Sequence, residues 1–409
     1  MNPRNSFWHY TAPAILGAIL ILLSSCKTNP PNAPSLPKLE FGKIFVSANV
    51  DGAKIYLDDI NTGKVTPDTI EAAIGIYELR LEKENYISSV QMVEVFKDSL
   101  VQISFLLEES FSKIFVTSNI SGARIFLDGI NTGKLTPDTV STDPGLHMVM
   151  IERAFYLPET QEIEAIEDTV VSLNFVLVEE TPHNVILLED FANVSCIPCV
   201  ISDAIVESLT RYTYGPSRLV AIKFPTNFPS PIDPMYLANS TDCDARMSYY
   251  NIFAAPTTII DGTERPISTD SLSVITAIDQ QLLKDTRFKI HVYDEIIGST
   301  YYSTVTIKVI DGAGIDFSNL VLHTVVTEKD IEFSTPPGAN GLTKFYDVMR
   351  AMLPTNAGES LNGISQTEEV VYQRQVSINP IWNVNKLNTV AFIQNVATKV
   401  VYQAASAFD

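Results

Sequence analysis

Apolar and polar positions alternate in short runs through the first half of the chain. In "AKIYLD" the side chains of Ala53, Ile55 and Leu57 share one face, which is typical of a half-buried strand. The triplets Asn61-Thr62-Gly63 and Asn131-Thr132-Gly133 accept positive φ, so we expect each at a hairpin turn. Short strands between such residues, with no long helical period, predict small all-β sandwiches.

This region is a duplication. The second copy, starting at Lys113, reads "KIFVTSNISGARIFLDGINTGKLTPDT", and the first starts at Lys43 with "KIFVSANVDGAKIYLDDINTGKVTPDT". The offset of 70 residues needs no gap, which identifies an internal repeat. Both copies resemble PEGA domains, which we place at residues 43–110 and 111–180. The resemblance implies β modules of bacterial envelope and surface proteins that contact proteins or glycans.

The pattern changes after residue 182. A nearly continuous apolar run from Val185 to Phe191 predicts a strand buried on both faces, as in a parallel or mixed sheet. "VISDAIVESLTRY" then carries apolar residues at helical spacing. "RLVAIKF" and "NIFAAPTTIIDG" read as further strands, and "SVITAIDQQLLK" as a closing helix. Residues 183–286 are therefore predicted to form an α/β domain.

Two cysteines lie between the first strand and helix of this domain. A helix N-terminus beside Cys196 would stabilise its thiolate, and Cys199 follows after two residues. The order of elements resembles the thioredoxin fold. That resemblance implies catalytic roles for both cysteines, a proton-transfer role for Asp190, and a cis-proline at Pro256 that faces the disulfide. Ser195 stands where thioredoxins have Trp.

A wider resemblance covers residues 183–407. "DPMYLANSTDCDARMSYYNIFAAPTTIIDG" and "WNVNKLNTVAFIQNVATKVVYQA" resemble the outer-membrane-protein-28-related lipoproteins of Bacteroidetes-type bacteria. The resemblance implies an envelope lipoprotein with a thioredoxin-like domain and a β-rich C-terminal domain. "STVTIKVID" alternates accordingly, with Val305, Ile307 and Val309 on one face. We expect residues 287–409 to form a β-sandwich, with Trp382 and Phe392 as core or strand-facing aromatic residues.

The N-terminus has the layout of a secretory signal, with Arg4 before a short apolar run that ends in small residues. Its last residues, "LSSC", resemble the lipobox of bacterial lipoproteins. That resemblance implies removal of residues 1–25 and lipidation of Cys26, which would anchor the chain to a membrane. Residues 26–42, rich in Pro and Asn, then read as a tether. We expect an outer-membrane lipoprotein that faces the periplasm or the outside.

Composition narrows the possible partners. The chain has 48 acidic and 28 basic residues and a formal net charge of -20, so nucleic acid is not an expected partner. No second Cys or His pair completes a zinc site, and no phosphate-binding loop is present. We therefore expect neither metal nor cofactor. Cys243 is left as the odd thiol, either buried and inert or available for a mixed disulfide.

Three functions remain open. In an oxidising envelope the Cys196–Cys199 pair should be a disulfide at rest, either as a structural element or as a redox centre. The first hypothesis is a binding or assembly module that contacts an unknown envelope protein or glycan. The second is a thiol–disulfide oxidoreductase in which Cys196 attacks and Cys199 resolves. The third is adhesion to glycan or cell wall through the PEGA pair.

Overall fold

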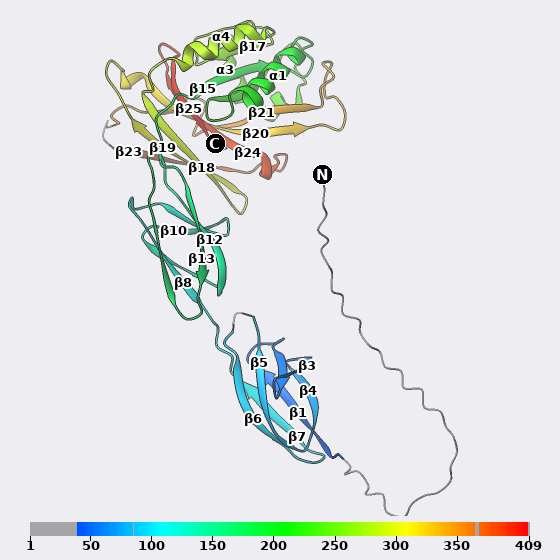
Figure 1. Cartoon of the computed structure of the whole chain (residues 1–409). Coiled ribbons are helices and arrows are strands. Elements are labelled where there is room, and N and C mark those ends of the chain that lie inside the picture. Colours follow the sequence, from blue (N-terminus) through cyan, green and yellow to red (C-terminus); the bar gives the residue numbers. More distant parts are fainter. Residues whose placement is uncertain (1–38, 85, 365–367, 408–409) are drawn as a thin grey trace, which may run out of the picture. The chain divides into compact units, whose positions relative to one another are not determined.

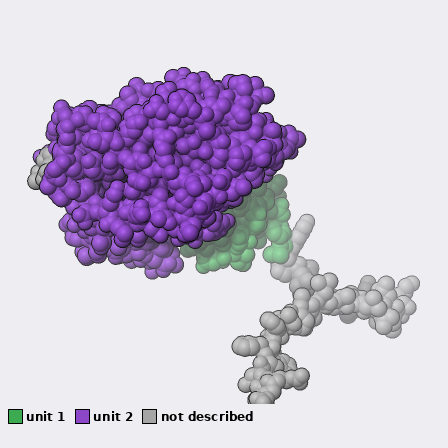
Figure 2. All heavy atoms as spheres, turned by 90° about the horizontal axis from the view of Figure 1, so that it is seen from above, with its two compact units in different colours: residues 1–110 green, residues 111–409 purple. Residues whose placement is uncertain are grey.

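The computed structural model describes residues 39–84, 86–364 and 368–407. The predicted signal peptide, the predicted lipidation site Cys26 and most of the predicted tether lie outside the described residues. The chain divides into two compact units, residues 1–110 and residues 111–409 (Figure 2). Strands dominate both units, as the sequence predicts (Figure 1). Within the described ranges, no helix is both long and apolar enough to cross a membrane.

The first unit is a sandwich of two sheets. Its strands are β1 (Phe41–Ala48), β2 (Lys54–Leu57), β3 (Ile60–Val65), β4 (Asp68–Ala73), β5 (Gly75–Glu82), β6 (Ser89–Val95) and β7 (Leu100–Phe105). They form the sheets β4-β1-β7 and β3-β2-β5-β6. Ala53 and Ile55 are fully buried and Leu57 is half-buried in the core between the sheets, so the predicted inward face is confirmed.

The second unit begins with the second copy of this sandwich. Its strands are β8 (Ser112–Ser118), β9 (Arg124–Leu127), β10 (Ile130–Leu135), β11 (Asp138–Thr142), β12 (Gly145–Glu152), β13 (Glu159–Ala165) and β14 (Val170–Phe175). The sheets β11-β8-β14 and β10-β9-β12-β13 repeat the strand order of the first copy. The duplication seen in the sequence is therefore a duplication of topology.

The predicted hairpin turns are wrong in position. The β2–β3 turn is made by Asp58 and Asp59, at φ 47° and 63°, and this pair of positive φ values suits the twist of a two-residue hairpin. Asn61 and Gly63 lie inside β3, where the pairing with β2 shifts register. Gly63 has φ 74°, and its N–H donates to Asn61 Oδ1 at 2.8 Å. The triplet therefore forms a β-bulge.

The α/β part of the second unit follows the predicted order. It contains β15 (Ile186–Ala192), α1 (Cys199–Ser208), the π-helical turn η1 (Leu209–Thr213), β16 (Leu219–Pro225), α2 (Pro234–Ala238), α3 (Ser240–Tyr250), β17 (Thr257–Ile260) and α4 (Ser271–Leu282). β15 pairs with β16 in parallel and with β17 antiparallel, and every residue of β15 and β16 is buried. Side chains of α1 and α4 pack on one face of these strands, and those of α3 pack on the other. α3 is an additional helix, beyond the elements predicted for residues 183–286.

The remaining residues supply strands and two short 3-10 helices. They are β18 (Phe288–Ile297), β19 (Thr300–Val309), η2 (Phe317–Asn319), β20 (Leu320–Glu332), β21 (Lys344–Leu353), β22 (Glu359–Ser360), β23 (Glu369–Ser377), η3 (Val384–Lys386), β24 (Leu387–Asn395) and β25 (Val401–Ser406). The sheet β18-β19-β23 shares a core with β20, β24 and β25, in which Val305, Ile307, Val309 and Ile393 are buried. Phe392 is fully buried and Trp382 is half-buried in other clusters.

One sheet crosses the boundary that we place at residue 286. Its order is β17-β15-β16-β21-β20-β24-β25, with β22 paired to β20. The junction is a parallel pairing of β16 with β21, at Lys223 and Val348. β16 is buried on both faces, so its second edge needs a partner for its backbone hydrogen bonds. β21 supplies that partner from more than a hundred residues downstream.

Candidate functional site

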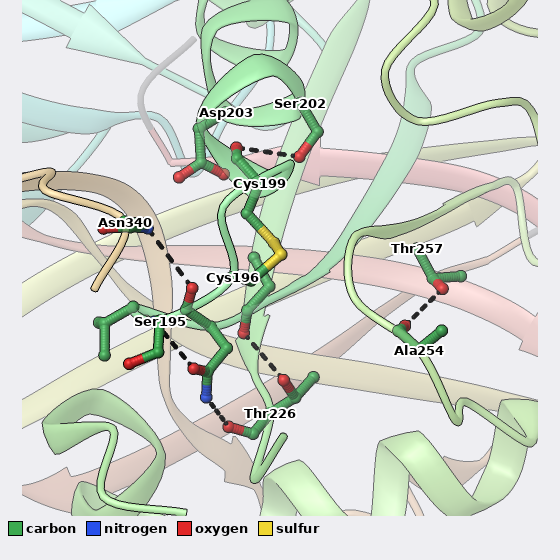
Figure 3. The surroundings of a disulfide bond; sticks show 12 residues. Ser195, Cys196, Cys199, Ser202, Asp203, Thr226, Ala254, Thr257 and Asn340 are labelled. Carbon is green, nitrogen blue, oxygen red and sulfur yellow. Dashed lines mark hydrogen bonds between the residues drawn. A yellow bond between two sulfur atoms is a disulfide. The ribbon is translucent and has the colours of Figure 1, made fainter. Parts of the chain in front are cut away.

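The two cysteines form a disulfide in the loop between β15 and α1 (Figure 3). Their Cα atoms are 5.3 Å apart. Cys196 is 3% exposed and Cys199 is fully buried. Cys199 is the first residue of α1, and its N–H donates to the carbonyl of Cys196 at 3.2 Å. The structure thus places the pair in a strand–loop–helix arrangement, with Cys196 one turn before the helix.

Pro256 immediately precedes β17 and belongs to the cis peptide that packs against the disulfide through Ala255. The Ala255–Pro256 peptide is cis, and Ala255 packs against the cluster of Ala192, Cys196 and Cys199. Thr257 Oγ1 donates to the carbonyl of Ala254 at 2.7 Å and fixes this turn (Figure 3). The structure therefore brings together Cys196, Cys199 and the cis peptide.

Asp190 belongs to a buried cluster of charges beneath α1. It is paired in register with Lys223 on the neighbouring parallel strand β16. Lys223 Nζ lies 2.5 Å from Asp190 Oδ2 and 2.5 Å from Asp203 Oδ1. The side chains of Asp190 and Lys223 are 1% and 7% exposed. Burial disfavours the ammonium, but the two carboxylates outweigh it and raise the pKa of Lys223.

The sequence analysis missed Lys223 and Asp203. Lys223 is the one charged residue in the apolar strand β16, and a lysine in such a strand needs a buried acidic partner. Asp203 stands four residues after Cys199, one helical turn further along α1. Both signals are visible in the sequence once the strand and the helix are assigned.

A loop between β20 and β21 covers the side of the disulfide where Ser195 lies. Asn340 N–H donates to the carbonyl of Val194 at 3.0 Å, and Ala339 N–H donates to Ser195 Oγ at 3.3 Å. Gly338 approaches so closely that a Cβ there would lie 2.3 Å from the Val194 oxygen. In Figure 3, Asn340 and the Ala254–Thr257 turn lie on opposite sides of the disulfide. The loop is therefore held tightly against the residues that precede Cys196.

Cys243 lies on α3, away from this loop, and is buried. Burial, together with the carboxylates of Asp242, Asp233 and Asp244, raises the pKa of the Cys243 thiol well above its ordinary value. The expected burial is confirmed, and a thiol with a raised pKa is a poor nucleophile at neutral pH. Within the described part of the chain, no three His, Cys, Asp or Glu side chains are grouped so that they could hold a metal ion.

Fold and site together define a mainly β protein that carries two copies of one sandwich module and a disulfide at the end of a buried strand. Residues 41–110 and 111–181 match the PEGA domain family. The chain therefore contains two PEGA domains, as the sequence predicts. None of the curated protein sequences matched this chain.

Solved structures share parts of the fold at low identity. HBP35 of Porphyromonas gingivalis is 14% identical, with a TM-score of 0.45, and the match covers 56% of this chain and 76% of that one. A domain of the outer membrane lipoprotein Omp28 from Porphyromonas gingivalis is 16% identical, with a TM-score of 0.22. That match covers 30% of this chain and 88% of the Omp28 domain.

Proposed function

We propose that this chain is a lipid-anchored cell-envelope protein that exchanges disulfides at Cys196 and Cys199 in a thioredoxin-like domain. The charge cluster at Asp190, Lys223 and Asp203 carries the proposal. Burying charges costs several kcal/mol each before pairing offsets it. A disulfide that only closes a short loop needs no such cluster and stabilises a fold weakly. A disulfide that turns over needs a nearby acid or base.

Each residue then has a definite role. Cys196, the more exposed of the two residues, attacks a substrate disulfide as a thiolate and forms the mixed disulfide, and Cys199 resolves it; oxidation of a substrate dithiol is the reverse of these steps. Asp190 accepts and returns the proton of the resolving thiol. Pro256, beside the disulfide, positions the bound segment of the substrate. The exchange needs no cofactor, since the disulfide accepts two electrons and the reduced cysteine pair gives them back.

Turnover by the chain without its signal peptide tests this function. We expect it to catalyse reduction of insulin disulfides by dithiothreitol, and we expect Cys196→Ser to abolish that catalysis. The reduction potential of Cys196–Cys199 should lie above about -300 mV, where exchangeable disulfides are found. A lower potential together with no turnover would contradict the proposal.

The second candidate is a binding or assembly role for the PEGA domains, directed at an envelope protein or a glycan. The outer face of the β5–β6 pair carries exposed apolar side chains, namely Ile76, Val90 and Met92, next to Glu78 and Arg80. Such a mixed surface favours contact with protein over carbohydrate. Binding of the mature chain to cell-wall glycan and to envelope extracts, with Met92→Lys as the variant, separates the two partners.

The membrane anchor is tested separately. Cys26→Ser should abolish incorporation of labelled fatty acid and release the chain from the membrane fraction. Retention of this variant in membranes would contradict the anchor and leave the redox proposal intact.

A further inference from the structure

A cavity of about 160 Å³ lies beside the buried charge cluster. Its walls come from β15, α1, β16, and β21 with the residues just before it. It is large enough for water, which needs only ~15 Å³ per molecule and several polar partners. Exposed Lys344 is among the lining residues, so the cavity connects the cluster to the surface. Its charged lining residues are Asp190, Asp203, Glu207, Lys223, Lys344 and Asp347.

One carboxylate oxygen at this cavity has no hydrogen-bond partner. Asp190 Oδ2 is paired with Lys223, while Asp190 Oδ1 is buried without any donor. An unpartnered buried acceptor is costly. Lys223 also binds Asp203, so one ammonium serves two carboxylates. Two carboxylates and one ammonium leave a net negative charge in this buried cluster, which favours protonation of one carboxylate. Asp203 is the neighbouring carboxyl group that can hold this proton.

Asp203 is also close enough to Cys199 along α1 for proton exchange with its thiol to be considered. The two residues are four apart on α1 and lie on the same side of the helix, and Figure 3 shows Asp203 one turn beyond Cys199. We propose that Asp203 is a second proton-holding residue of the redox site, which shares a proton with Asp190 and exchanges it with solvent through the adjoining cavity. This inference rests on the proposed function and extends it to the route of the proton.

The step balances in atoms and electrons. A substrate dithiol with one thiolate attacks Cys196 Sγ, and the disulfide bond breaks with its electron pair on Cys199. Cys199 takes the proton held by the Asp190–Asp203 pair. The second substrate thiol returns a proton to that pair and attacks the substrate sulfur of the mixed disulfide, so Cys196 leaves as thiolate. The cysteine pair gains two electrons and the substrate dithiol becomes a disulfide.

The electrostatic surroundings suit this role near neutral pH. Burial raises the pKa of Asp203 to about 6, and Asp190 adds to that effect while Lys223 opposes it. A group with such a pKa can both give and take a proton near neutral pH. Asp347 on β21 is the competing carboxyl, because burial raises its pKa to about 6 as well. The charged or titratable groups that face the cavity are, besides Asp190 and Lys223, Glu207 on α1, Lys344, Tyr346 and Asp347.

The test measures how the rate at which dithiothreitol reduces the Cys196–Cys199 disulfide depends on pH, in the chain without its predicted signal peptide. Each rate is divided by the concentration of dithiothreitol thiolate at that pH. Between about pH 4.5 and 8.5, we expect the wild-type rate to fall as pH rises through about 6, because departure of Cys199 requires the proton. Asp203→Asn should lose this inflection and react about tenfold more slowly at low pH. Glu207→Gln and Asp347→Asn, which line the same cavity, should keep it.

Two outcomes overturn the inference: an unchanged profile in Asp203→Asn, or loss of the inflection in Asp347→Asn instead. Infrared spectra guard against a folding artefact. At pH 5 Asp347 and Asp261 also contribute to the protonated-carboxyl band, so Asp203→Asn should lose one component of that band, whereas Glu207→Gln should keep all of them. The two proposals fail separately. If the chain does not reduce insulin but the pH profile still shows an inflection that depends on Asp203, only the oxidoreductase function is rejected. If the chain reduces insulin but the inflection is missing, only the role of Asp203 is rejected.

Discussion

At the residue scale, buried carboxyl groups decide how the second unit responds to pH. Asp261, just after β17, is 7% exposed, and burial raises its pKa to about 7. An unfolded Asp titrates near 3.9. Between about pH 4 and 7 the folded chain therefore binds more protons at this site than the unfolded chain. The free energy of unfolding falls with rising pH across that window and is level above it.

Asp261→Asn should stabilise the second unit at pH 8. The amide is neutral at every pH, its oxygen can still accept the Leu187 N–H that Asp261 Oδ1 accepts at 2.9 Å, and Asn tolerates the local φ of 43°. We expect a gain on the order of 2 kcal/mol at pH 8 and little change at pH 4. Urea unfolding followed by Trp382 reports this unit, because the other tryptophan, Trp8, lies in the predicted signal peptide and is absent from the chain without it. An equal gain at both pH values would contradict this account.

Candidate site residues were predictable from the sequence where a local motif or a family resemblance identified their positions. Apolar spacing places the cysteines between a strand and a helix, whereas Asp190 and Pro256 were singled out by the resemblance to the thioredoxin fold. Lys223 and Asp203 each stand out on their own element, but their contact with one another and with Asp190 depends on the register of β15 and β16 and on the packing of α1 against these strands. No spacing along the chain encodes that pairing.

At the scale of elements, the local sequence predicts the strands more accurately than the turns between them. Asp58-Asp59 and Asn61-Thr62-Gly63 both favour positive φ, and from sequence alone either could close the hairpin. The inward-facing positions Ile55 and Leu57 of β2 decide the register. They leave the second motif inside β3 as a bulge.

The β20–β21 loop packs against the two residues that precede Cys196, so its position can be tested as a determinant of access to the disulfide. Gly338→Ala places a Cβ 2.3 Å from the Val194 oxygen, so the loop must move away. We expect a loss of about 1–2 kcal/mol in stability. Reduction of the disulfide by a protein dithiol such as reduced thioredoxin should become several-fold faster, while reduction by dithiothreitol changes less.

Ala339→Ser is the matched control for this loop, since the Ala339 side chain is exposed and its N–H can keep the bond to Ser195 Oγ. Both rates should stay at the wild-type level in the control. Equal acceleration with both reductants in Gly338→Ala would show that the loop does not discriminate by size.

At the scale of the whole molecule, the sequence predicts modules but not how they join. The sheet that crosses residue 286 depends on the β16–β21 pairing between segments far apart in the chain. Helical or strand periodicity carries no information about such a partner. The second PEGA domain is joined to the rest of its unit in the same non-local way. Arg153 Nη2 lies 2.7 Å from Glu369 Oε2, and Lys289 Nζ lies 3.0 Å from Glu179 Oε1.

A difference between the two repeats marks this junction. At the repeat offset of 70, Glu84 and Asn85 of the first PEGA domain correspond to Ala154 and Phe155 of the second. Phe155 is 2% exposed, and Lys289 Nζ of β18 lies 5.8 Å from its ring centroid. An aromatic residue has replaced a polar one where the second domain meets β18.

Phe155→Asn, which restores the residue of the first repeat, tests whether this contact holds the second PEGA domain. Loss of a buried Phe side chain costs about 3–5 kcal/mol. Phe155 has φ 70°, which Asn adopts more readily than Phe, and this returns about 1 kcal/mol. The loss of burial is the larger effect, and we expect a net loss of about 2–4 kcal/mol. Phe126→Tyr, which also restores a first-repeat residue, should be nearly neutral. Hydrogen exchange of the mature chain should show faster exchange in β12 and β18 for Phe155→Asn alone, and unchanged protection there would mean that the ion pairs suffice.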